Sequence, residues 1–177
     1  MKLVILKIGS VKMAIALVGF MGSGKTTVGQ ILAKFLNIPW IDLDQKIEEE
    51  VGMPIHKFLT KFNENVFRAK ESQLLLKNLK KEIVLSTGGG VVIKECNRKA
   101  LKKESQCCIC LTASFPVLIK RIRQNKENIR PLAAKSVKKL FAERKSWYKE
   151  VATLTIQTDE KSPTSVAKEI IQRMKKL

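Results

Sequence analysis

Residues 19–26 have the types and spacing that bind the phosphate groups of a nucleotide. They read Gly-Phe-Met-Gly-Ser-Gly-Lys-Thr, which is a glycine, four residues and then Gly-Lys-Thr. In such a loop the glycines let backbone N–H groups approach the phosphates, the lysine reaches the β and γ phosphates, and the threonine hydroxyl binds Mg²⁺. The predicted nucleotide-binding residues of the loop are Gly22, Ser23, Gly24, Lys25, Thr26 and Thr27.

The segments on both sides of this loop fit that interpretation. Residues 14–18, Ala-Ile-Ala-Leu-Val, are typical of a buried parallel strand. After the loop, apolar side chains recur at helical spacing, at Val28, Ile31, Leu32, Phe35 and Leu36. The loop is therefore predicted to end at a helix N-terminus, whose dipole adds positive potential at the phosphates.

Two carboxylates follow the next predicted strand, residues 39–41. Asp42 and Asp44 are two residues apart, so on a strand they would project from the same face at its C-terminal end. Ligands of open α/β sheets bind at that end. For Asp44 an alternative is the N-cap of a helix over residues 45–50.

A guanidinium group and a glycine segment are two further candidates for a ligand site. Arg68 lies on a predicted helix over residues 64–79, between Glu64 and Glu71. The alternative for Arg68 is a surface ion pair on a solvated helix. Gly88, Gly89 and Gly90 follow a predicted strand over residues 83–86 and would let a ligand approach the backbone, unless they form only a flexible turn.

Predicted strands and helices alternate along the chain, which indicates an α/β protein with three layers, α/β/α, around a five-stranded parallel sheet. Two more strands are predicted at residues 107–111 and 153–158. The remaining helices are predicted over residues 54–62, over about 114–123, from about 137, and in a closing segment that carries Val166, Ile170 and Met174. Residues 124–135 are polar and basic at their start, without apolar periodicity, and are predicted to form a mobile lid.

Composition narrows the class of protein and of partner. The 177 residues are 45% hydrophobic, and 34 basic against 16 acidic residues give a formal charge of +18. The basic residues are dispersed and lack interleaved aromatic residues, so we expect anionic small molecules rather than specific nucleic acid as partners. No apolar run is long enough for a membrane span, and we expect a cytoplasmic protein.

The cysteines and the histidine give no sign of a metal or catalytic site. Cys107, Cys108 and Cys110 lie in one apolar run, and residues three apart on a strand point to opposite faces. They are predicted to be core residues in a reducing compartment. The single histidine, His56, has no acidic or hydroxyl partner nearby in the sequence.

The chain is predicted to form a single domain over residues 13–177, preceded by an extension over residues 1–12. The periodic pattern begins at about residue 14, so the extension is expected to be dispensable or a loose edge strand.

Several spaced motifs together resemble the shikimate kinase family, within the nucleoside-monophosphate-kinase-like P-loop proteins. They are the loop 19–26, Asp42-x-Asp44, Glu64-x-x-Phe67-Arg68-x-x-Glu71, Thr87 with the three glycines, Arg130-Pro131-Leu132, and Glu143-Arg144 with Tyr148. The resemblance implies a P-loop kinase fold that transfers the γ-phosphoryl group of ATP to the 3-hydroxyl of shikimate, with Mg²⁺.

The resemblance also implies a role for each matching residue. Asp44 would bind the shikimate hydroxyls and orient the nucleophile, and Asp42 would help to hold the Mg²⁺ shell. Arg68 and Arg144 would hold the shikimate carboxylate beside Gly88, Gly89 and Gly90. Lys25 and the lid residue Arg130 would stabilise the charge that develops on the phosphates, and Arg123 would pack against adenine.

The sequence departs from the family pattern at a few positions. Asn63 replaces a glycine before Glu64, and since asparagine tolerates the left-handed conformation we expect the turn to persist. Ala133 replaces a leucine after Arg130-Pro131-Leu132, and a proline common before Tyr148 is absent. Two alternatives to a shikimate kinase remain, a kinase of another hydroxylated metabolite such as gluconate and a nucleic-acid-binding ATPase. We expect the protein to be a monomer.

Overall fold

The computed structural model describes residues 13–124 and 134–177. Its five strands form one sheet in the order β2-β3-β1-β4-β5, and every neighbouring pair is parallel. The strands are β1 (Ile15–Val18), β2 (Trp40–Asp42), β3 (Val84–Ser86), β4 (Cys107–Thr112) and β5 (Leu154–Gln157). The predicted α/β fold with a five-stranded parallel sheet is confirmed.

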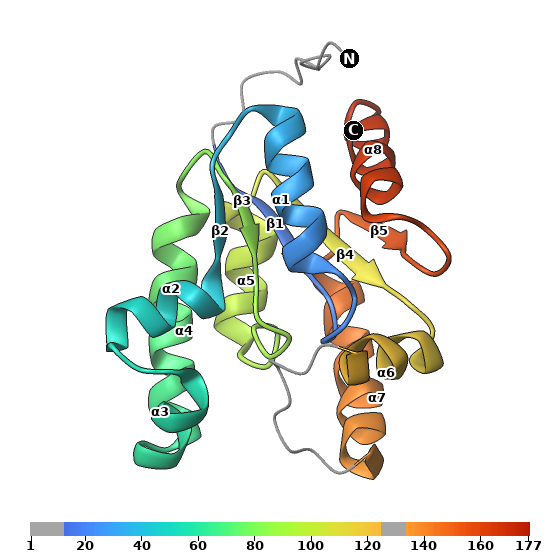
Figure 1. The fold of residues 1–177 in the computed structure, drawn as a ribbon. Helices are drawn as coiled ribbons and strands as arrows, with labels where there is room; N and C mark the ends of the chain where they lie inside the picture. The colour runs from blue at the N-terminus through green and yellow to red at the C-terminus, as the bar shows by residue number, and fades with distance from the viewer. Residues whose placement is uncertain (1–12, 125–133) are drawn as a thin grey trace.

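Helices cover both faces of this sheet (Figure 1). On one face lie α1 (Lys25–Leu36) and α8 (Pro163–Met174), and their apolar side chains share a core with one face of β1, β4 and β5. On the other face lie α4 (Glu64–Leu79), α5 (Glu95–Glu104) and α7 (Ala134–Val151). All four residues of β1 are buried because helices cover both of its faces.

Helix α1 begins and ends at left-handed residues. Gly24, with φ 95°, precedes Lys25, the first helical residue, so the phosphate loop runs directly into the helix N-terminus. Asn37, with φ 55°, ends the helix, and its N–H donates to carbonyl groups of the last turn. Both the helix and its predicted C-terminal residue are confirmed.

The segment after β2 differs from the prediction. β2 is only three residues long, and α2 (Leu43–Val51) follows it at once. Asp42 is the N-cap of α2, with Oδ1 accepting from the N–H of Asp44 at 3.0 Å. Asp44 is therefore neither a strand residue nor the N-cap, but lies in the first turn of α2.

The next helices, α3 (Ile55–Lys61) and α4, are separated by Phe62 and Asn63. Asn63 has φ −79° and is the N-cap of α4, with its side chain accepting from the N–H of Val66 at 3.0 Å. The chain still turns between the two helices, as expected, but Asn63 does not use the left-handed conformation and instead caps α4. The departure from glycine thus supplies a cap that glycine could not.

The region beyond the glycine segment contains one helix that the sequence did not predict, α5. Helix α6 (Phe115–Gln124) follows β4, and Asp159, beyond β5, accepts from the N–H of Ser114 at 3.0 Å.

The predicted extension over residues 1–12 and most of the predicted lid, including Arg130, lie outside the described residues. Within the described ranges, no helix has the length and apolarity needed to cross a bilayer.

Candidate active site

The phosphate loop is held in an open, left-handed path by its glycines. Gly22 and Gly24 have φ of 77° and 95°, which side chains disfavour. A Cβ atom at Gly22 would also lie 3.0 Å from the backbone oxygen of Leu118 in α6. The buried hydroxyl of Ser23 has no hydrogen-bond partner among the described residues. The loop therefore has the conformation of a phosphate cradle, with one polar group still unsatisfied.

Lys25 places its ammonium group inside this loop. Nζ donates to the backbone oxygens of Gly19 at 2.9 Å and Phe20 at 3.0 Å, and only 9% of the residue is exposed. Burial lowers the pKa of Lys25 to about 8, although the charges of Asp44 and Asp42 oppose the shift. Lys25, the first residue of α1, is thus a desolvated ammonium group in the loop that is within electrostatic range of both carboxylates.

Thr26 and Asp42 meet beside the loop. Thr26 Oγ1 donates to Asp42 Oδ2 at 2.9 Å, which joins the first turn of α1 to the end of β2. Asp42 Oδ1 is used to cap α2, so the second carboxylate oxygen is the one that faces Thr26. A hydroxyl and a carboxylate oxygen at this distance are hard ligands of the kind that Mg²⁺ prefers.

Arg68 is buried beside the sheet rather than solvated on its helix. Its Nη1 donates to both carboxylate oxygens of Glu71, at 3.0 and 2.8 Å, and its Nη2 to Glu64 at 3.1 Å. Arg68 is 7% exposed and Glu71 1%. Burial lowers the pKa of Arg68, but the two carboxylates outweigh it and leave that pKa above its ordinary value. The ion pairs with Glu64 and Glu71 are present, and the interpretation of a solvated surface pair was wrong.

The three glycines bring the predicted substrate residues together. A Cβ atom at Gly88 would lie 2.5 Å from Oδ1 of Asp44, and one at Gly90 would lie 2.5 Å from Nη2 of Arg68. The carbonyl oxygen of Gly89 accepts from Nη1 of Arg144 at 3.1 Å. One carboxylate and two guanidinium groups, from α2, α4 and α7, therefore surround a single short backbone segment, and the interpretation of a plain flexible turn was wrong.

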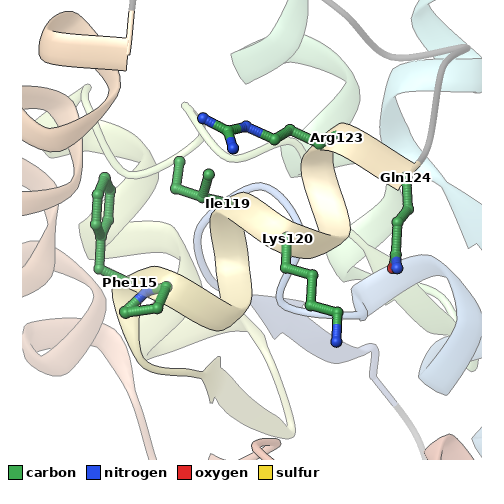
Figure 2. Close-up of a pocket in the computed structure, with 6 residues that line it drawn as sticks. Phe115, Ile119, Lys120, Arg123 and Gln124 are labelled. Carbon is green, nitrogen blue, oxygen red and sulfur yellow. The ribbon is translucent and has the colours of Figure 1, made fainter.

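The arginine predicted to meet adenine, Arg123, lies at the end of α6. Figure 2 shows it extending back along the helix above Ile119, over a pocket that Phe115 also lines. Lys120 and Gln124 point to a different side of the helix (Figure 2). The phosphate loop is contacted by Arg121, whose Nη1 lies 3.4 Å from the oxygen of Gly22.

Three residues of this region were not identified as functional from the sequence. Arg121 joins the loop to the residue that follows β5, by donating from Nη2 to the oxygen of Thr158 at 2.7 Å. Tyr148 is buried and its hydroxyl donates to the oxygen of Gly89; burial raises the pKa of this phenol. Arg98 on α5 contacts the backbone just beyond the glycines. Tyr148 could have been identified from the sequence, because it is part of the motif with Glu143 and Arg144. Arg121 and Arg98 could not, because nothing in the sequence distinguishes them from the many other basic residues.

Comparison with known proteins identifies relatives of this site and fold. The family model described as shikimate kinase matches residues 21–175. A shikimate kinase of Enterococcus faecalis is 45% identical over 166 residues, which is 92% of this chain and 98% of that protein. One from Lactococcus lactis subsp. lactis is 42% identical over 91% of this chain and 98% of its own length. The solved structure of shikimate kinase from Acinetobacter baumannii in complex with shikimate superposes with a TM-score of 0.85, at 33% identity and 92% coverage of both chains.

Proposed function

Since this chain belongs to the shikimate kinase family and is an ATP-dependent kinase that phosphorylates shikimate, we propose that the residues around Gly88–Gly90 bind the substrate. The observation that carries this proposal is the convergence of Asp44, Arg68 and Arg144 on three successive glycines. Shikimate is an anionic triol, so it needs guanidinium groups for its carboxylate and an acceptor for its hydroxyl groups. These three side chains have the matching chemistry.

In the proposed reaction, the side chains act mainly by positioning and by electrostatic stabilisation. Arg68 and Arg144 hold the carboxylate, which fixes the ring so that its 3-hydroxyl faces the nucleotide. Asp44 orients this hydroxyl and accepts its proton as the oxygen attacks the γ phosphorus of ATP. The bond from that phosphorus to the β–γ bridging oxygen breaks, and ADP leaves. Lys25, with Arg130 from the predicted lid, stabilises the charge on the transferred group.

Mg²⁺ is proposed as the metal of this site, held by Thr26 and Asp42. The fit rests on the two oxygen donors that already meet at 2.9 Å beside the phosphate loop. In the described part of the chain, no group of three or more His, Cys, Asp or Glu side chains gathers that could hold a metal. Mg²⁺ usually keeps several waters and is bound by one or two carboxylates together with substrate phosphates. The ion would supply charge neutralisation at the phosphate oxygens.

A coupled assay that detects ADP tests the substrate assignment. The protein is given ATP with shikimate, gluconate or a nucleoside monophosphate, in the presence of Mg²⁺. We expect turnover with shikimate at least about a hundredfold faster than with either alternative, because only shikimate presents a carboxylate on a ring that two arginines can hold. Turnover with gluconate at a rate near that with shikimate would overturn the proposed site.

We also propose a monomer in the cytoplasm, with residues 13–177 as the catalytic domain and the small-molecule substrates as the only required partners. The free, buried cysteines of β4 suit a reducing compartment. Sedimentation analysis of the protein with and without ATP tests the monomer, and a mass twice that of the chain would contradict it.

A further inference from the structure

The backbone that follows the glycine segment is fixed by two side chains of α5. Asn97 Nδ2 donates to the oxygen of Val91 at 2.9 Å. Arg98 Nη1 donates to the oxygen of Val92 at 2.9 Å and to that of Ile93 at 3.1 Å. Three successive carbonyl groups directly after Gly88–Gly90 therefore accept hydrogen bonds from neighbouring residues of one helix.

Arg98 also reaches the helix that carries Arg144. Its Nε lies 2.9 Å from Glu150 Oε2, an ion pair without the alignment of a hydrogen bond, and its Cζ lies 5.3 Å from the centre of the Trp147 ring. Helices α5 and α7 pack side by side on the same face of the sheet (Figure 1). The Arg98 side chain is only 14% exposed, whereas that of Glu150 is 41% exposed, so the ion pair is partly screened by water and the hydrogen bonds of Arg98 to the backbone hold it more firmly.

These contacts connect the two sides of the proposed binding site for the substrate carboxylate, which are the Gly88–Gly90 segment and helix α7. On one side, Arg98 donates a hydrogen bond to the backbone oxygen of Val92, beyond the glycines. On the other side, it forms an ion pair with Glu150 of α7. Helix α7 returns to the same glycines, because Arg144 and Tyr148 both donate to the oxygen of Gly89. Trp147 and Glu150 flank Tyr148 on α7, so Arg98 holds the turn of the helix that lies next to Arg144.

We infer that Arg98 is a positioning residue for the kinase reaction, which keeps Arg144 on α7 in register with Gly88–Gly90 so that both can hold the substrate carboxylate. This inference rests on the proposed substrate site. A guanidinium is needed because one planar group must donate to two carbonyls and also face an indole ring and a carboxylate. The residue acts through Arg144 and the glycines and does not itself touch substrate.

The test compares Arg98→Ala and Arg98→Lys with Lys99→Ala, the neighbouring position on α5, whose side chain is 76% exposed and pairs with Glu95. We expect Arg98→Ala to raise the KM for shikimate about tenfold, as displaced positioning groups do. The KM for ATP should stay within about twofold, because the phosphate loop keeps its own contacts. Arg98→Lys should give an intermediate KM for shikimate, and Lys99→Ala should match the wild type.

Measurements are made at a temperature where circular dichroism shows each variant folded. An unchanged KM for shikimate in both Arg98 variants would overturn the inference. So would an equal rise of both KM values, since that indicates general loosening. If Arg98→Ala does not fold, Arg98→Lys and Glu150→Gln decide by the same criteria, with a smaller rise expected from Glu150→Gln.

A double-mutant cycle with Arg144→Ala separates this inference from the proposed site. If Arg98 acts through Arg144, the losses of shikimate affinity in the double mutant are less than the sum of the single losses. Additive losses overturn the inference alone. An Arg144→Ala variant with unchanged shikimate affinity overturns the proposed site as well.

Discussion

The guanidinium group of Arg68 lies against the Cα atom of Gly90, in the space that any larger residue at position 90 would fill. A Cβ atom there would lie 2.5 Å from Nη2 and 2.7 Å from Cζ of Arg68. Arg68 cannot easily retreat, because Glu71 and Glu64 hold its three nitrogens. A glycine is therefore required at position 90 by the Arg68 side chain from α4, and the contact joins α4 to the segment after β3.

Gly90→Ala should displace Arg68 and weaken shikimate binding about tenfold, while ATP affinity is unchanged. The added methyl group should also cost about 1–3 kcal/mol of stability through overpacking. Isothermal titration and thermal unfolding measure the two effects. Gly89→Ala is the matched control for stability, because its Cβ atom would approach no atom closer than 3.4 Å. Equal stability losses in both variants would contradict the contact as the cause.

ATP binding should depend on pH through Lys25, whose pKa burial lowers to about 8. Phosphate groups favour the charged form and raise this pKa, so binding takes up a proton at pH 8–9. ATP affinity should therefore fall as pH rises above about 8, by at most tenfold per pH unit. The unfolded chain, in which the lysine pKa is about 10.4, binds more protons between those two values, so this residue makes stability rise with pH there.

Calorimetry of ATP binding at pH 8.5, in buffers of different ionisation enthalpy, counts the protons taken up. Lys25→Ala should abolish this uptake and turnover, and leave the circular-dichroism spectrum unchanged. Turnover of Lys25→Ala within tenfold of the wild type would contradict the role of Lys25 at the phosphates. ATP binding to the wild type without proton uptake would contradict the lowered pKa of Lys25.

Asp42→Asn should separate the metal role of this residue from its capping role. Asparagine caps helices as well as aspartate does, so the free energy of unfolding should change by less than about 1 kcal/mol. The Mg²⁺ concentration that gives half-maximal activity should rise, by about tenfold, because one anionic ligand is lost. An unchanged Mg²⁺ requirement in a folded variant would remove Asp42 from the metal site.

A chain that begins at Met13 should fold and phosphorylate shikimate as the full chain does. Ala14 is completely buried and hydrogen-bonded to the oxygen of Leu79, so the described fold is already anchored there. Thermal unfolding and steady-state kinetics of the two chains check this. A melting temperature lower by more than about 5 °C, equivalent to about 2 kcal/mol for a chain of this size, would assign residues 1–12 a part in the fold.

Local patterns were enough to predict most of the fold. The strand, loop and helix around Lys25 were predicted because a buried strand, spaced glycines and an apolar stripe each leave a clear signal, and Asn37 marked the end of α1. Helix α5 was missed because most of its residues are charged or polar and few of its side chains are buried, Ala100 and Leu101 among them. It is held partly by the polar contacts of Asn97 and Arg98, which leave no periodic pattern.

The sequence was enough to predict which residues form the site, but less so to predict which elements carry them and how deeply they are buried. Asp42 and Asp44 were placed on one strand face, whereas the short β2 puts Asp44 on a helix. Burial of Arg68 depends on the close approach of Gly90, which is a tertiary contact between distant segments. The sequence pattern of α4 alone is the same for a buried and a solvated arginine.

Calorimetric titration of shikimate into Arg144→Ala and Arg68→Lys tests most directly whether Arg68 and Arg144 together hold the shikimate carboxylate, an arrangement called here the carboxylate clamp. Lysine is used at position 68 because removing the charge would break the buried ion pair with Glu71, at a cost of about 3–5 kcal/mol in stability. Arg173→Ala, an exposed arginine on α8, is the control. Charge-assisted hydrogen bonds are worth about 1.5–3 kcal/mol, so Arg144→Ala should bind shikimate ten- to a hundredfold more weakly, with ATP affinity unchanged. Arg68→Lys should lose less, because an ammonium keeps the charge without the fork. Wild-type shikimate affinity in both variants would contradict the clamp.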